Sequence, residues 1–154
     1  MILISDCPIF LFETTAKNLD IQIEKIINFG PDCEKEILDN TKECLLLITQ
    51  SFYNNFETIN TYKEFTEDLL VTKSCIFKIL KRLSNIGSQV YFPLVPKHFI
   101  YKDRNSKFFF EKDSKDIFIN NINNNLFMEF NNFSNLIFLR GIENISTKIS
   151  KDFF

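Results

Sequence analysis

The first half of the chain carries three apolar stretches separated by polar breaks. Met1–Phe12 is largely apolar and predicts a strand or hydrophobic arm packed on the core. Lys17–Phe29 fits both strand alternation and helical spacing, so its class stays open. After the break at Gly30-Pro31-Asp32, apolar residues at mostly helical spacing predict one long buried helix from Cys33 to about Asn54, with Asp32 as its cap.

Two shorter helices joined by a turn are predicted between Thr61 and Gly87. A helix-turn-helix needs apolar contacts from its first helix, an apolar plug in the turn, a hydroxyl cap and an inward apolar stripe on its second helix. The turn position that often carries Gly is Leu70 here. The residues that fill the other positions are Phe65, Leu69, Val71, Thr72, Ile76, Leu80 and Leu83.

The rest of the chain predicts a hairpin and then further helix. Residues 88–112 are β-like, with a turn at Asp103–Ser106 that would complete a basic wing, and residues 113–133 read as weakly helical. The predicted fold class is therefore mostly α with a small β-hairpin, a winged helix-turn-helix embedded in a helical domain. We expect a single domain over 1–154, with a winged helix-turn-helix-like region at 33–112 and a helical C-terminal extension at 113–154.

Composition places the chain among globular proteins. Its 154 residues are 45% hydrophobic and 25% charged, which suits one ordinary domain. No apolar run reaches the roughly 18 residues that span a bilayer, so no membrane partner is expected. The four cysteines form no CxxC pair, which argues against a zinc site. Cys44 and Cys75 stand in apolar periodic segments, which predicts buried, reduced thiols and a cytoplasmic location.

Charge is distributed unevenly along the chain. The formal net charge is −2, but residues 1–60 hold four basic and ten acidic residues, and residues 61–110 hold nine basic and four acidic ones. The basic segment contains the second predicted helix, about 72–86, which would lie in the major groove of DNA. The residues predicted to contact DNA are Thr72, Lys73, Ser74, Lys78, Lys81 and Arg82, with Lys102 and Arg104 from the wing.

The stretch Cys44–Leu83 also resembles the DNA-binding segment of the Mga-type transcriptional regulators of Gram-positive bacteria. The resemblance covers about residues 33–112 and implies that Lys73, Ser74 and Lys78 contact DNA. Members of that family are longer, with two helix-turn-helix units and downstream domains bearing His residues, whereas this chain has one unit and a single histidine, His98. The matching positions are Leu46, Leu47, Phe52, Phe56, Phe65, Leu69, Val71, Thr72, Ser74, Lys78, Leu80 and Leu83.

The sequence thus predicts a DNA-binding transcriptional regulator that binds double-stranded DNA. Such regulators commonly dimerise on paired half-sites, so a homodimer is a further expectation. No enzyme, cofactor or metal site is expected, because three separated glycines build no phosphate loop and His98 stands in no nucleophile motif. The alternative is a non-enzymatic helical protein–protein interaction module, such as an inhibitor or adaptor, that binds through a Phe-rich apolar groove.

Overall fold

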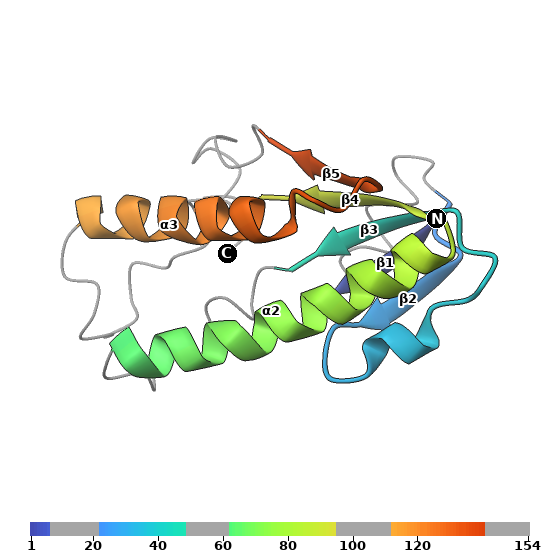
Figure 1. Cartoon of the computed structure of the whole chain (residues 1–154), viewed down its shortest axis with the longest axis horizontal. Helices are drawn as coiled ribbons and strands as arrows, with labels where there is room; N and C mark the ends of the chain where they lie inside the picture. Colours follow the sequence, from blue (N-terminus) through green and yellow to red (C-terminus); the bar gives the residue numbers. More distant parts are fainter. Residues whose placement is uncertain (7–21, 49–61, 95–111, 141–154) are drawn as a thin grey trace, which may run out of the picture.

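The described residues form one parallel sheet with helices packed on it (Figure 1). The computed structural model describes residues 1–6, 22–48, 62–94 and 112–140. Within them lie a short 3-10 helix, η1 (Cys33–Glu36), and two long helices, α2 (Tyr62–Asn85) and α3 (Lys112–Phe130). The strands are β1 (Ile2–Ser5), β2 (Lys25–Asn28), β3 (Glu43–Leu47), β4 (Gln89–Pro93) and β5 (Leu136–Leu139).

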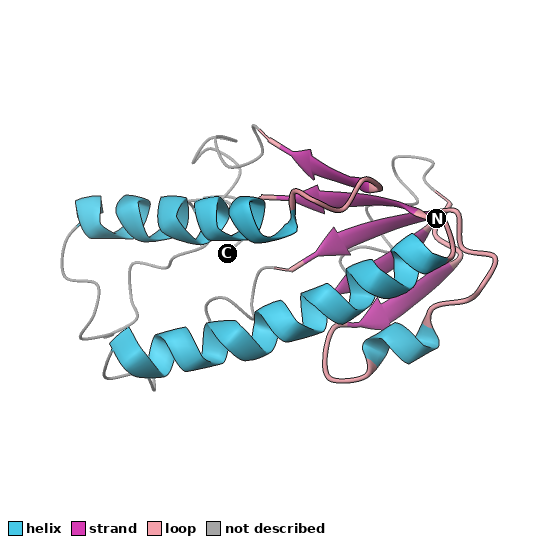
Figure 2. Ribbon diagram, viewed as in Figure 1, coloured by secondary structure: helices cyan, strands magenta, loops and turns pink. Residues whose placement is uncertain are grey.

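The five strands run in the order β2-β1-β3-β4-β5, and every neighbouring pair is parallel. Parallel neighbours cannot be joined by a tight turn, so each connection must return along one face of the sheet. The returns from β3 to β4 and from β4 to β5 contain α2 and α3. In Figure 2 the two helices lie side by side, with α2 partly in front of the strands and α3 mostly beyond the strand tips. The architecture is therefore an open α/β sheet.

Alternate strand residues build the core beneath the helices. Because side chains alternate between the faces of a strand, Cys44 and Leu46 of β3 share one face, and neighbouring strands extend it in register. Cys44 is level with Val90 of β4, and Leu46 is level with Ile4 of β1. All four of these side chains are buried in one apolar cluster, which places the core between the sheet and the helices.

Both helices face this cluster with residues at helical spacing. On α2 the buried stripe includes Ile76, Ile79 and Leu83, and on α3 it includes Leu126 and Phe130. Removing each such side chain from water contributes roughly 1.5–3 kcal/mol, and this burial fixes the helices on the sheet. The helices thus hold to the sheet by apolar contact along their inward faces.

The sheet's other face is covered unevenly. Leu3 of β1 is fully buried there, whereas Leu45 and Tyr91 on β3 and β4 are partly buried and Ile137 on β5 is exposed. Burial on this face therefore decreases from β1 toward β5.

The predicted fold class, mostly α with a winged helix-turn-helix, is wrong. Where the sequence predicted two helices and a turn, α2 runs without interruption through Leu70, Val71 and Thr72. Neither Gly nor Pro occurs between Tyr62 and Asn85 to end a helix. Continuous helical periodicity places Leu70 and Val71 on the exposed face and Thr72 on the buried face, so no residue plugs an inter-helix angle.

The predicted long helix from Cys33 to Asn54 is also wrong. Only Cys33–Glu36 is helical, and Glu43–Leu47 forms β3 at the centre of the sheet. Asp32 makes no side-chain capping hydrogen bond and has a left-handed backbone, with φ of 65°. A consecutive apolar run fits a parallel strand buried on both faces as well as a helix, and tertiary context selects the strand.

Other predicted elements agree with the structure. β1 falls within the apolar N-terminal stretch and β4 within the β-like segment, and α3 coincides with the weakly helical region apart from its first residue, Lys112. Gly87 follows α2 with φ of +71°, as expected of a residue that ends a helix. The predicted hairpin turn at Asp103–Ser106 lies outside the described residues. β5 was not predicted, because Leu136–Leu139 is a short apolar run in a mixed tail.

Neither α2 nor α3 is long and apolar enough, over its described residues, to cross a lipid bilayer.

Candidate functional site

The residues predicted to contact DNA do not share one free face. Thr72 is only 7% exposed, because it lies on the inward side of α2. The Lys73 side chain is 14% exposed, and its Nζ forms an ion pair with Oε2 of Glu129 on α3 at 2.5 Å. Ser74, Lys78 and Lys81 are exposed on the opposite side of the helix. Lys102 and Arg104 lie outside the described residues.

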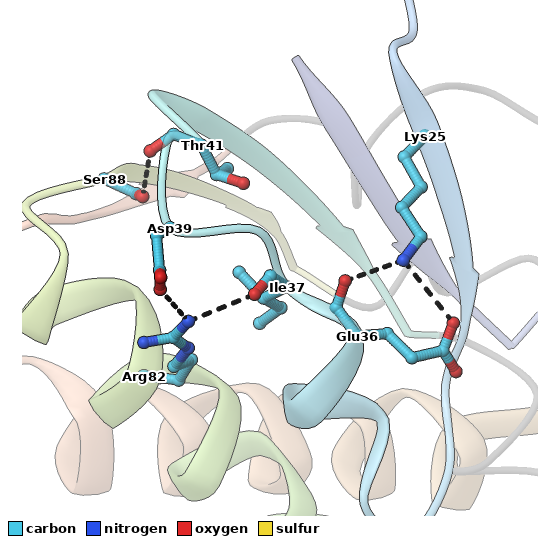
Figure 3. A network of polar contacts seen from close by, with 7 residues as sticks. All are labelled: Lys25, Glu36, Ile37, Asp39, Thr41, Arg82 and Ser88. Atoms are coloured by element: carbon cyan, nitrogen blue, oxygen red, sulfur yellow. Dashed lines mark hydrogen bonds and ion pairs between the residues drawn. The ribbon is translucent and has the colours of Figure 1, made fainter.

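Arg82 serves the fold at the other end of α2. Its Nη2 donates a hydrogen bond to the carbonyl oxygen of Ile37 at 3.2 Å and a second one to the carboxylate of Asp39. Figure 3 shows the guanidinium reaching from α2 to the segment between η1 and β3. Through these two contacts of Nη2, Arg82 holds the connection into β3 against α2.

The amino ends of the strands are closed by further polar contacts of this kind (Figure 3). Ser88, just before β4, donates its hydroxyl hydrogen to the carbonyl oxygen of Thr41 at 2.6 Å. Lys25, at the start of β2, donates to the carbonyl oxygen of Glu36 at 2.7 Å. Asn135, just before β5, donates through Nδ2 to the carbonyl oxygen of Ser88 at 2.8 Å. This edge of the sheet is therefore held together by structural hydrogen bonds.

The carboxyl edge of the sheet carries polar residues at the end of β1. β1 ends in Ser5, which is 2% exposed, and Asp6 follows directly, half-buried. β1 is the second strand in the sheet order and pairs with β2 on one side and β3 on the other. A buried hydroxyl and a carboxylate thus stand together at the carboxyl end of a strand inside the sheet.

Strand order reverses direction beside Ser5 and Asp6. The chain passes from β1 outward to β2, then crosses back over β1 to β3 and continues to β4 and β5. The connections leaving β1 and β3 therefore depart in opposite directions along the sheet. In open parallel sheets this reversal is where ligands bind, outside the carboxyl ends of the strands.

The two long helices extend past this edge. α2 has 24 residues, which corresponds to a length of about 36 Å, whereas β3 has five residues and a length of about 17 Å. Figure 1 shows the amino-terminal ends of α2 and α3 well beyond the tips of the strand arrows. Both helices therefore extend beyond the carboxyl edge of the sheet.

The carboxyl edge also carries a positively charged side chain next to the outer strand β5. Arg140 follows β5, and its Cζ lies 4.5 Å from the centroid of the Phe127 ring on α3. A guanidinium over an aromatic ring gains cation–π attraction, which orients the side chain without neutralising it. The carboxyl edge thus carries an acid next to its central reversal and a base at β5.

The described cysteines are poor nucleophiles and are not part of this edge. Burial raises the pKa of the Cys44 thiol to about 12. Burial likewise raises the pKa of Cys33 and of Cys75. All three are free and buried, as the sequence predicted for Cys44 and Cys75. Among the described residues, no three His, Cys, Asp or Glu side chains come together to hold a metal ion.

Sequence reasoning did not single out Ser5 and Asp6. The apolar run before them predicted a strand, but the pattern along the chain does not show that this strand lies inside the sheet or where the winding reverses. Comparisons with protein-family models, curated proteins and solved structures found no match for this chain.

Proposed function

We propose that the chain is a binding domain for a small polar molecule, with its site at the carboxyl edge of the sheet between β1 and β3. The reversal of strand order beside Ser5 and Asp6 is the observation that carries this proposal.

The residues at the end of β1 narrow the ligand class. Sheets that bind nucleotides place a glycine-rich turn after the first strand, where bare backbone N–H groups hold phosphate. Here the sequence after β1 begins Asp6-Cys7-Pro8, and the three glycines of the chain lie elsewhere. A carboxylate repels phosphate and accepts hydrogen bonds from hydroxyl or ammonium groups. We therefore assign the site to a neutral or cationic ligand that bears such groups.

The predicted DNA-binding function rested on a helix-turn-helix, and this segment of the chain is one continuous helix, α2. Its recognition helix, about 72–86, is the carboxyl-terminal part of α2, with Thr72 buried and Lys73 paired to Glu129. Docking of a winged helix-turn-helix on DNA is accordingly not proposed. The alternative of a protein-interaction function draws support from apolar side chains exposed on α2, which are treated below.

A binding experiment with Asp6 variants tests the proposal. Saturation-transfer NMR would use glucose, adenosine, spermidine and inorganic phosphate as probes, with wild type, Asp6→Asn, Asp6→Ala and the amino-edge control Glu43→Gln. We expect saturable binding of at least one neutral or cationic probe by the wild type and by the control, with at least tenfold weaker binding by both Asp6 variants. Circular dichroism checks that each variant is folded.

Two outcomes would contradict the proposal. In one, none of the hydroxyl- or amine-bearing probes binds the wild type. In the other, a probe binds wild type and folded Asp6→Asn equally, which would place the ligand away from the carboxyl edge.

A further inference from the structure

The outward face of α2 carries exposed apolar side chains that the proposed function does not use. Leu70 is 59% exposed, Val71 62% and Phe77 48%. Ser74, Lys78 and Lys81 are exposed on the same face. Single exposed apolar residues are ordinary on protein surfaces, but three within two turns of one helix face form a patch of the kind that marks an interaction site.

This outward face is arranged symmetrically about Ser74. Val71 and Phe77 stand three residues before and after it, and Leu70 and Lys78 stand four residues before and after it. At 100° per residue these positions share one side of the helix with Ser74. About two turns before Ser74 the sequence has an acidic residue, Glu67, and about two turns after Ser74 it has a basic residue, Lys81.

We propose that α2 pairs with α2 of a second copy of this chain, antiparallel, with the two-fold axis at Ser74. A two-fold interface requires that each patch complement itself, so that if one residue meets another, the reverse contact also forms. Antiparallel pairing brings Val71 of one copy level with Phe77 of the other. The small side chain of Ser74 at the crossing point lets the helix axes approach to about 8–10 Å.

Charge favours the same arrangement. The antiparallel copy brings acidic position 67 level with Lys81 of the second chain at both ends of the contact, whereas a parallel copy would bring like charges together. At Lys78 the aliphatic stem can cover Leu70 of the second copy while the ammonium group reaches water. An anionic membrane would instead favour a face that is basic along its whole length.

A contact between two aromatic rings of the same chain already fixes the position of Phe77 in this patch. The Phe77 ring meets the Phe133 ring edge to face, with centroids 5.8 Å apart and an interplanar angle of 72°. Because Phe77 is held from one side while about half of it stays exposed, little side-chain freedom is lost when a second copy covers it.

Cysteine crosslinking tests the position of the axis. Ser74→Cys would place two thiols at the axis, whereas Ser84→Cys, at an exposed position farther along α2, would place them about 30 Å apart along the helices. Under copper-phenanthroline oxidation, we expect Ser74→Cys to form a covalent dimer on non-reducing gels. Ser84→Cys and the wild type should form several-fold less.

A charge exchange tests the orientation. In sedimentation equilibrium, Glu67→Lys alone and Lys81→Glu alone should each weaken dimerisation about tenfold, and the double variant Glu67→Lys/Lys81→Glu should return to within about twofold of wild type. Val71→Glu/Phe77→Glu should be monomeric at concentrations where the wild type is a dimer. Circular dichroism confirms that these surface variants are folded.

Three results would overturn the proposal. They are a wild type that is monomeric up to millimolar concentration, equal crosslinking of the two cysteine variants, and a double charge variant no better than the singles. Co-sedimentation of monomeric protein with phosphatidylserine vesicles, lost in Val71→Glu/Phe77→Glu, would assign the face to a membrane surface instead.

Discussion

Lys73 on α2 and Glu129 on α3 form an ion pair, with 2.5 Å between Nζ and Oε2, that joins the two long helices. The lysine side chain is 14% exposed and the glutamate side chain 44%, so the pair is shielded from water on one side. A residue that the sequence assigned to DNA contact therefore serves to hold the helices together.

Breaking this pair should destabilise the protein modestly. We expect Lys73→Met and Glu129→Gln each to lower the free energy of unfolding by about 1 kcal/mol, because each leaves one partly buried charge without its partner. The double variant should lose less than the sum of the two. Urea denaturation of the four proteins measures the coupling, and additive losses would show that the pair contributes nothing.

Arg82 should matter more than its carboxylate partner. Asp39 has an 86% exposed side chain, so its ion pair with Arg82 is largely screened by water. The bond from Arg82 to the carbonyl oxygen of Ile37 is partly buried and fixes the backbone. We expect Arg82→Ala to cost about 1–2 kcal/mol of unfolding free energy and Asp39→Asn less than about 0.5 kcal/mol. Lys42→Ala, at an exposed position near Asp39, is the matched control with little effect. Equal losses from all three variants would contradict this prediction.

Replacing Gly87 should destabilise the protein because of the backbone conformation at this position, and not because a larger side chain would be crowded. Its φ is +71°, a region that costs an L-residue about 1 kcal/mol, although a methyl group added there would meet no atom within 4 Å. Gly87→Ala should therefore lower the free energy of unfolding by about 1 kcal/mol. Gly30→Ala, at an equally open position without a positive φ, should cost much less. Thermal denaturation separates the two, and indistinguishable melting temperatures would contradict the prediction.

Buried Cys44 should make stability fall in alkaline solution. Burial raises the pKa of its thiol to about 12, while in the unfolded chain the pKa of a cysteine thiol is about 8.5. Between these values the unfolded chain has released a proton that the folded chain retains. The free energy of unfolding therefore decreases as pH rises, by up to about 1.4 kcal/mol per pH unit from this residue.

The variant Cys44→Ala tests this contribution. Urea denaturation at pH 8 and pH 10 should show a smaller difference between the two pH values for Cys44→Ala than for the wild type. Lysine and tyrosine titrations are common to both proteins and cancel in the comparison. An unchanged pH difference in the variant would mean that Cys44 does not titrate as the structure requires.

The sequence predicted best where the local pattern alone decides the structure. The inward stripe of α2, with Ile76 and Leu83, was recognised from its spacing and is buried as expected. The error at Leu70–Thr72 arose because apolar and hydroxyl residues at those offsets fit both a turn and an unbroken helix. In the structure the same offsets place Leu70 outward and Thr72 inward on one continuous helix.

Other features depend on contacts between distant segments. The run Cys44–Leu47 becomes a strand because β1 and β4 flank it, and neither neighbour can be inferred from the run itself. The edge strand Leu136–Leu139 is only four residues long and follows a polar turn. Ser5 and Asp6 form a candidate site only because of the strand order, which the sequence pattern does not show.

Amide NMR during titration with a binding probe locates the ligand directly. If the carboxyl edge binds a small polar ligand, chemical-shift changes concentrate at Ser5, Asp6 and Ile48, at the carboxyl ends of β1 and β3. Thr41, Ser88 and Asn135 at the amino edge should stay unchanged. Changes centred on the amino edge, or spread evenly over both edges, would contradict the proposed site.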